Sequence, residues 1–178
     1  MHYVMANSKY GGDVSKAADH KDGLVVLASI FHASDKNDTY MQPLLNGLDK
    51  VEEEGTNTTL KGETILLDHI LPDDRDLFFK YEGSLTTPPC SQAVTWIVYR
   101  DISAINEEQL NAFRELKTHD VNNNGIKIGH NVRELQLQED RDVFGSVGPR
   151  RGQKPHGFVD HLHDLLGWNA KEPAIKLL

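Results

Sequence analysis

The sequence predicts a mostly β domain with few helices. Apolar and polar residues alternate in several short segments before residue 145, as they do in strands. Helical spacing of apolar residues is confined to two segments of that region. The chain has 178 residues, of which 38% are hydrophobic. A chain of this length can bury roughly 70% of its unfolded surface, so one ordinary core is expected without a disulfide framework.

Five segments have the composition of strands. The first, residues 2–5, places His2 and Val4 on one face because side chains alternate along a strand. The second, residues 23–31, is apolar almost without interruption, so we expect it in the middle of a sheet that is covered on both faces. The remaining three are residues 77–81, 94–99 and 134–137.

Two segments are predicted to be helical. Residues 39–51 repeat apolar side chains at intervals of three and four, which is typical of an amphipathic helix packed on a sheet. Residues 106–116 place Leu110, Phe113 and Leu116 at the same intervals. Ser103 stands before two glutamates there, as at the start of a helix. Both helices are expected to have structural roles.

The composition changes near residue 145. Residues 145–155 are rich in glycine, proline and basic side chains and are predicted to be a flexible linker. The main domain is therefore expected at residues 1–144, and residues 145–178 are expected to form the linker and a short amphipathic helical tail. His161 and His163 of that tail would lie about 200° apart on a helix. This favours a surface or partner-docking role over metal binding there, although a strand would reverse the geometry.

Charge and composition exclude some functions. Nineteen Lys and Arg stand against 27 Asp and Glu, for a net charge of −8, and the pI is about 5.5. This balance leaves no excess of positive charge to neutralise phosphates, so no nucleic-acid partner is expected. No apolar stretch approaches the ~20 residues that span a bilayer, and residues 1–9 lack the features of a signal peptide. No transmembrane segment is therefore expected.

Cysteine content and glycosylation motifs give opposite indications about location. Cys90 is the single cysteine, so it cannot form a disulfide within the chain, which favours the cytosol or an unpaired thiol. Two glycosylation motifs, which begin at Asn37 and Asn57, favour secretion. The conflict suggests that a segment before residue 1 is missing.

Residues 81–90, with the sequence Tyr-Glu-Gly-Ser-Leu-Thr-Thr-Pro-Pro-Cys, are the most informative segment for chemistry. Pro88 and Pro89 fix their own backbone, and Pro88 restricts Thr87 to extended conformations. A loop held in this way can keep a threonine hydroxyl in place for catalysis. A plain turn with a cis Pro88–Pro89 bond is the alternative from composition alone. His2 also allows two interpretations: it is either a zinc ligand in an apolar pocket or an ordinary strand histidine.

These segments together resemble the alpha-class carbonic anhydrases. Residues 84–90, followed by residues 94–98, are similar to the signature of that family. Residues 1–10 resemble its strand with the third zinc histidine, and residues 22–27 resemble its central core strand. The resemblance extends to about residue 144. It implies a large, twisted, mainly antiparallel sheet with a few peripheral helices, here without the N-terminal strands.

The resemblance implies zinc-dependent, reversible hydration of carbon dioxide to bicarbonate, the lyase reaction of a carbonate dehydratase. It makes His2 a zinc ligand and Thr86 the hydroxyl that orients the attacking hydroxide, with Thr87 on the polar side. Zinc lowers the pKa of a bound water so that hydroxide is present at neutral pH. The residues implied to form the apolar wall where carbon dioxide waits are Val4, Leu24, Val26, Leu85, Val94 and Trp96.

The chain also departs from the family pattern. The other two zinc histidines form a His-x-His pair on an upstream strand that this sequence lacks, and the proton-shuttle histidine is absent too. One histidine cannot hold zinc tightly, so zinc is expected in the full-length protein and weak or absent in this chain. Family members that are secreted pair a cysteine at the place of Cys90 with one near the N-terminus.

We therefore interpret the chain as the C-terminal portion of a secreted family member. Glycosylation at Asn37 and Asn57 is expected in that case. Two alternatives stay open. One is a non-catalytic carbonic-anhydrase-related protein that binds a partner, and the other is a chain without a function of its own.

Overall fold

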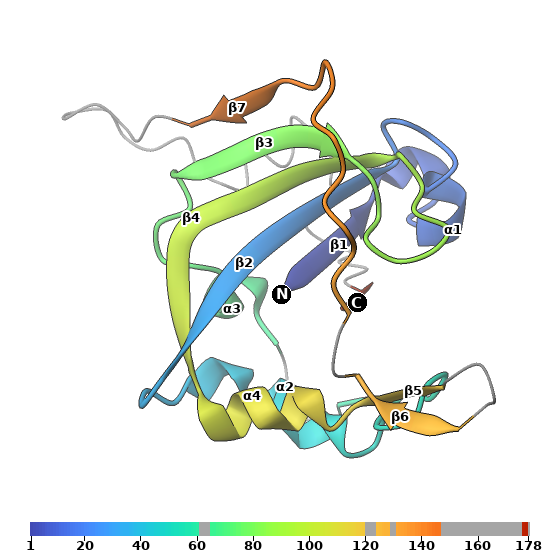
Figure 1. The fold of residues 1–178 in the computed structure, drawn as a ribbon. Coiled ribbons are helices and arrows are strands. Elements are labelled where there is room, and N and C mark those ends of the chain that lie inside the picture. The colour runs from blue at the N-terminus through green and yellow to red at the C-terminus, as the bar shows by residue number, and fades with distance from the viewer. Residues whose placement is uncertain (61–64, 120–123, 129–130, 147–175, 178) are drawn as a thin grey trace. The chain divides into compact units, whose positions relative to one another are not determined.

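The computed structural model describes residues 1–60, 65–119, 124–128, 131–146 and 176–177. Six strands form one sheet in the order β7-β3-β4-β2-β1-β8, and two form a second sheet (Figure 1). The strands are β1 His2–Ala6, β2 Leu24–Ser34, β3 Phe78–Gly83, β4 Val94–Asn106, β5 Lys117–His119, β6 Gly125–Lys127, β7 Val143–Gly145 and β8 Lys176–Leu177. The helices are η1 Ser8–Tyr10, α1 Val14–Ala17, η2 Thr39–Met41, α2 Gln42–Leu48, α3 Leu67–Ile70 and α4 Glu107–Arg114.

The large sheet is mixed and mostly antiparallel, which confirms the predicted fold class. Strand β1 pairs antiparallel with β2 and β8, and β3 pairs antiparallel with β4 and β7. Strands β2 and β4 are neighbours and run in the same direction in Figure 1. Their long apolar runs suit the interior of the sheet. No helix in the described ranges is long and apolar enough to cross a membrane.

The sheet buries residues of both its faces around β1 and β2. Opposite residues of a ladder share a face, so Val4 and its partner Val26 lie on one side and Tyr3 and Leu27 on the other. All four have 1% or less of their surface exposed. The covered strand predicted at residues 23–31 is confirmed for its first part, whereas the strand becomes exposed from Ile30 onward.

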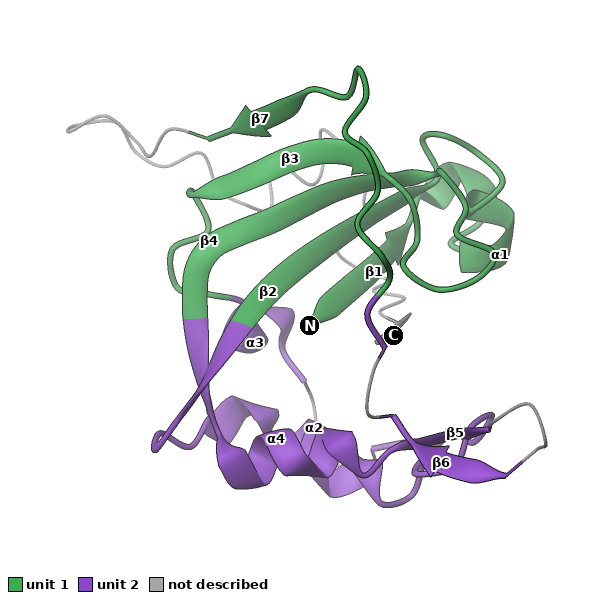
Figure 2. Cartoon of the chain, viewed as in Figure 1, with its two compact units in different colours: residues 1–30, 72–102, 133–178 green, residues 31–71, 103–132 purple. Residues whose placement is uncertain are grey.

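The chain divides into two compact units (Figure 2). Unit 1 contains Met1–Ile30, Pro72–Ile102 and Arg133–Leu178, and unit 2 contains Phe31–Leu71 and Ser103–Val132. The candidate active-site residues, including His2 and Thr86, all belong to unit 1. The two glycosylation motifs belong to unit 2.

Both predicted helices are present in unit 2, and the residue that caps the second is Asn106 rather than Ser103. Residues 39–48 form η2 and α2, and residues 107–114 form α4. The expectation that Ser103 marks the start of this helix is wrong, because β4 continues past Ser103 to Asn106. The Asn106 side chain accepts a hydrogen bond from Gln109 N at 2.8 Å, so Asn106 is the cap.

The strand predicted at residues 134–137 is also wrong. These residues have no ladder partner in the described part of the chain, and Leu135 is fully exposed. Strand β7 lies further along instead, where Gly145 pairs with Phe79 of β3. Alternating polarity favours a strand only when a sheet edge is free to pair with it, and β7 takes the β3 edge.

We expect Gln109 to stabilise unit 2 through its buried side chain. Its Oε1 accepts from Asp38 N at 2.9 Å, and its Nε2 donates to Asp38 O at 2.7 Å. Gln109→Ala should lower the free energy of unfolding by about 1–3 kcal/mol because both backbone groups lose their partner. Gln109→Glu should lower the free energy of unfolding at least as much, because it places a carboxylate oxygen against the Asp38 carbonyl oxygen. Thermal unfolding followed by circular dichroism, with the exposed Gln42→Ala as control, tests this expectation.

Asp22 should make the stability of unit 1 depend on acid pH. Tyr10 Oη donates to Asp22 Oδ1 at 2.5 Å and Lys9 Nζ to Oδ2 at 3.2 Å, and these bonds lower the pKa of the Asp22 carboxyl. The stabilisation is present above the unfolded pKa of about 4 and is lost as pH falls through the lower folded value. An NMR titration of Asp22 checks this. Tyr10→Phe should raise the pKa, and an unchanged titration would contradict the assignment.

Candidate functional site

The residues predicted to form the apolar wall lie together in the structure. Five belong to one buried cluster on β1, β2 and β4, and the half-buried Leu85 packs against that cluster. The five are Val4, Leu24, Val26, Val94 and Trp96, with exposed fractions of 1–5%. They form a packed apolar layer, and their role toward a substrate stays a prediction.

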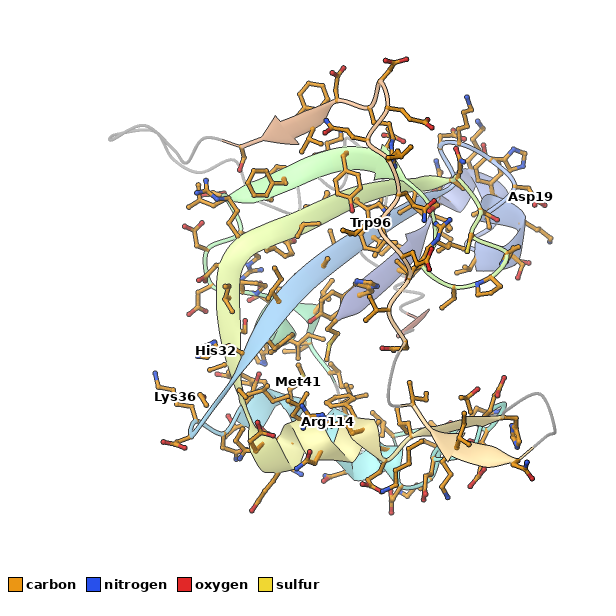
Figure 3. The ribbon with its side chains drawn as sticks, viewed as in Figure 1. Asp19, His32, Lys36, Met41, Trp96 and Arg114 are labelled. Carbon is orange, nitrogen blue, oxygen red and sulfur yellow. The ribbon has the colours of Figure 1, made fainter. Side chains whose placement is uncertain are left out.

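His2 adjoins this cluster at the start of β1. Its ring meets the ring of Trp96 edge-on, with 4.8 Å between the centroids and 75° between the planes. Burial, followed by the positive charge of the amino terminus, lowers the pKa of His2. A lowered pKa favours the neutral imidazole, which is the form that binds a metal. Figure 3 shows Trp96 on β4 among the side chains of the sheet.

The described residues do not make a zinc site by themselves. No group of three or more His, Cys, Asp or Glu side chains in the described ranges could hold a metal ion. A catalytic zinc site takes three protein ligands and one open position, and His2 supplies one. His20, His32, His69 and His119 are exposed. His130, His156, His161 and His163, together with the predicted linker beyond Ser146 and the predicted tail apart from β8, lie outside the described residues.

The threonine-proline loop joins β3 to β4. Thr86 and Thr87 are exposed, and the Pro88–Pro89 bond is cis. The loop is closed by backbone hydrogen bonds from Leu85 N to Ser91 O at 3.0 Å and from Cys90 N to Thr87 O at 2.9 Å. Across the described ranges, no protein group hydrogen-bonds to the hydroxyl of either threonine. Both hydroxyls can therefore interact with a ligand.

Three further predicted positions have environments that suit the expectations made for them. Cys90 is a half-buried free thiol whose backbone has a φ of 59°. Asn37 is exposed and accepts a hydrogen bond from Asn106 Nδ2 at 3.4 Å. Asn57 is exposed in a segment without regular structure. Disulfide pairing and glycosylation at these residues stay predictions.

The sequence analysis did not predict that Arg133 holds this loop. Arg133 Nη1 donates to Ser84 Oγ and, at 3.2 Å, to Leu85 O. Trp96 Nε1 donates to Ser84 O at 3.1 Å. Arg133 lies 48 and 49 residues from these acceptors along the chain, and no local pattern in a sequence signals such a contact.

Comparison with known proteins agrees with this fold. A family model described as eukaryotic-type carbonic anhydrase matches residues 1–147. Carbonic anhydrase 6 of Mus musculus is 36% identical over 154 residues, which cover 82% of this chain and 47% of that protein. Carbonic anhydrase 4 of Oryctolagus cuniculus is 31% identical over 146 residues, which cover 81% and 46%.

A third relative is named as related to carbonic anhydrases rather than as a carbonic anhydrase. Carbonic anhydrase-related protein of Rattus norvegicus is 31% identical over 151 residues, which cover 80% of this chain and 50% of the relative. The chain thus spans about half the length of each of these three relatives. With residues 1–147 matched by the family model, the chain belongs to the eukaryotic-type carbonic anhydrase family.

Proposed function

We propose that the protein containing this chain catalyses the reversible hydration of carbon dioxide to bicarbonate, with zinc as its cofactor. The observation that carries the proposal is the contact of His2 with Trp96, which belongs to the cluster that contains five of the predicted wall residues. A histidine and an apolar layer at one place suit a metal site that takes a nonpolar substrate.

In this proposal each part of the site has its own task. The layer that includes Val4, Val26 and Trp96 excludes water from the place where carbon dioxide lies, because it offers no polar group. Thr86 orients the attacking oxygen with its free hydroxyl, and Thr87 lines the polar side. His2 is the zinc ligand that the described residues supply, so further ligands are needed from outside them.

The test measures zinc content and carbon dioxide hydration on the same folded sample. The first sample is this chain, for which we expect well under one zinc per molecule and no hydration. The second is a fusion that carries the amino-terminal half of Carbonic anhydrase 6 of Mus musculus ahead of Met1. We expect about one zinc per molecule and hydration above the uncatalysed rate. A folded fusion with one zinc and no hydration would refute the proposed activity.

Thr86→Ala in that fusion should lower turnover by about 10²-fold, the effect of losing one positioned hydrogen bond at a reacting group. Thr86→Ser, which retains the hydroxyl, should recover most of the activity. Stopped-flow hydration assays at equal zinc content give the comparison. Turnover unchanged in Thr86→Ala would remove Thr86 from the mechanism.

A non-catalytic, partner-binding relative is the second candidate function. Two observations favour it. The described ranges contain no group of three side chains that could hold a metal ion, and two relatives are not named as carbonic anhydrases. These are the carbonic anhydrase-related protein and receptor-type tyrosine-protein phosphatase zeta of Homo sapiens, which is 31% identical over 134 residues. The fusion experiment separates the two candidates, because a binding relative would fold without hydrating carbon dioxide.

We also propose that the full-length protein is secreted. The exposure of Asn37 and Asn57 supports glycosylation, and the accessible thiol of Cys90 supports pairing with a cysteine outside this chain. The fusion, expressed in secreting animal cells behind a signal peptide, should lose mass on treatment with an N-glycosidase. Asn37→Gln with Asn57→Gln should abolish that loss, and a native mass unchanged by the enzyme would contradict glycosylation.

A further inference from the structure

We propose that Arg133 is a positioning residue for the Thr86 hydroxyl, an inference that rests on the proposed function. Arg133 follows the second sheet in the chain and reaches back to the loop between β3 and β4. A single nitrogen, Nη1, donates to the Ser84 hydroxyl and to the Leu85 carbonyl. Leu85 immediately precedes Thr86, so the arginine holds the peptide from which the threonine extends.

The other hydrogen bonds of the loop do not hold the carbonyl of the peptide bond that joins Leu85 to Thr86. The orientation of that peptide bond therefore depends on Arg133. On the far side of Thr86, the two prolines and the Cys90 N to Thr87 O bond restrict the backbone. On the near side, Trp96 Nε1 holds the Ser84 carbonyl, and Leu85 N is bound to Ser91 O. The Leu85 carbonyl, which belongs to the peptide bond joining Leu85 to Thr86, is held by Arg133. That bond therefore sets the orientation of the peptide plane that carries Thr86 N.

The chemistry of arginine suits this position. Its guanidinium group stays protonated at every pH of interest, so the bonds do not depend on titration. A hydrogen bond from a charged donor is about twice as strong as one between neutral groups. Because one nitrogen serves both acceptors, a lysine ammonium can occupy the same place, whereas a methionine of similar length cannot donate. Arg133→Lys and Arg133→Met therefore form a matched pair.

The first test uses the 178-residue chain and needs no zinc. Amide hydrogen exchange at Leu85 and Cys90, whose N–H groups donate to Ser91 O and Thr87 O in this loop, should be about tenfold faster or more in Arg133→Met, with exchange in β2 unchanged. Arg133→Lys should restore most of the protection. Arg114→Met, which removes an exposed ion pair with Glu107 in unit 2, is the control and should leave the loop unchanged. Equal loop exchange in the Met variant and the native chain overturns the proposal.

A second variant, Ser84→Ala, tests the proposal if Arg133→Met fails to fold. Ser84→Ala removes one acceptor and leaves the arginine and the Leu85 carbonyl in place. We expect this variant to fold and to keep the protection of the Leu85 and Cys90 amides, because the arginine still holds the Leu85 carbonyl. If Ser84→Ala speeds exchange at these two amides by about tenfold, the serine rather than the carbonyl carries the effect and the proposal is wrong.

The final readout is kinetic and uses the fusion protein. Arg133→Met should lower kcat by about 10²-fold with little change in KM, since a displaced group loses rate while the apolar layer is intact. Arg133→Lys should recover most of kcat. A fall in KM and kcat that lysine does not rescue overturns the positioning role. If the native fusion shows no hydration, the proposed function fails, and the exchange result still decides whether Arg133 orders the loop.

Discussion

Gly23→Ala should unfold unit 1 or lower its stability by about 4 kcal/mol or more, at the upper end of single-substitution effects. A Cβ placed on Gly23 would lie 1.7 Å from the Ala17 carbonyl oxygen and 2.8 Å from the His20 carbonyl oxygen. Both atoms are backbone, so no side-chain rotation relieves the overlap. The residue also enters the central strand directly, because Leu24 follows it in β2.

The local hydrogen bonds make this overlap hard to relieve by backbone movement. Gly23 N donates to His20 O at 2.9 Å, and Asn7 N donates to Gly23 O at 2.8 Å. A shift of Gly23 would break both bonds and pull on the end of β1. Urea unfolding followed by circular dichroism tests the prediction.

A glycine with open surroundings provides the control for Gly23. In Gly125 of β6, an added Cβ would meet side-chain atoms at 3.7 and 3.8 Å, which is ordinary contact distance. Gly125→Ala should therefore stay within about 0.5 kcal/mol of the native chain, as surface substitutions usually do. Equal stability of the two variants would show that the turn before β2 can rearrange around a methyl group.

Trp96→Ala should lower the free energy of unfolding by about 3–5 kcal/mol, the usual range for removing a buried large aromatic side chain. Trp96 has 5% of its surface exposed. Its ring meets His2 edge-on and stacks over Tyr81 at 6.3 Å between centroids. Its Nε1 also donates to Ser84 O, so the substitution leaves that carbonyl without its partner.

Trp96→Phe separates packing from hydrogen bonding. A phenyl ring keeps most of the contact with the apolar cluster and cannot donate to Ser84 O. We expect a loss of about 1–2 kcal/mol relative to the native chain, from the unpaired carbonyl and the smaller ring. Thermal and urea unfolding of both variants give the difference. A Phe variant as unstable as the Ala variant would mean that the indole N–H, and not the ring, dominates.

Local sequence patterns determined the strands of the interior and the two helices of unit 2. Residues 2–6, 24–34, 78–83 and 94–106 are strands in the structure, near the predicted positions. An uninterrupted apolar run such as 24–28, rich in β-branched residues, suits a strand covered on both faces. Short helices such as α1 and α3 were not predicted, because four residues contain too little periodicity to detect.

Residues 134–137 show why pattern alone is insufficient at a sheet edge. Their alternation is typical of a strand, yet β7 occupies the β3 edge and Leu135 is fully exposed. Pairing depends on which other segment reaches the edge, and no local window of sequence contains that information.

The sequence by itself determined the family resemblance, the fold class and the candidates at His2, Thr86 and the apolar wall. These depend on residue type and short spacing, which a linear chain displays directly. The tertiary structure alone decided that the wall residues form one cluster with His2 against Trp96. It also decided that Arg133 holds the loop before Thr86. Contacts between residues tens of positions apart arise from strand order and register, which are set by the packing of the whole sheet.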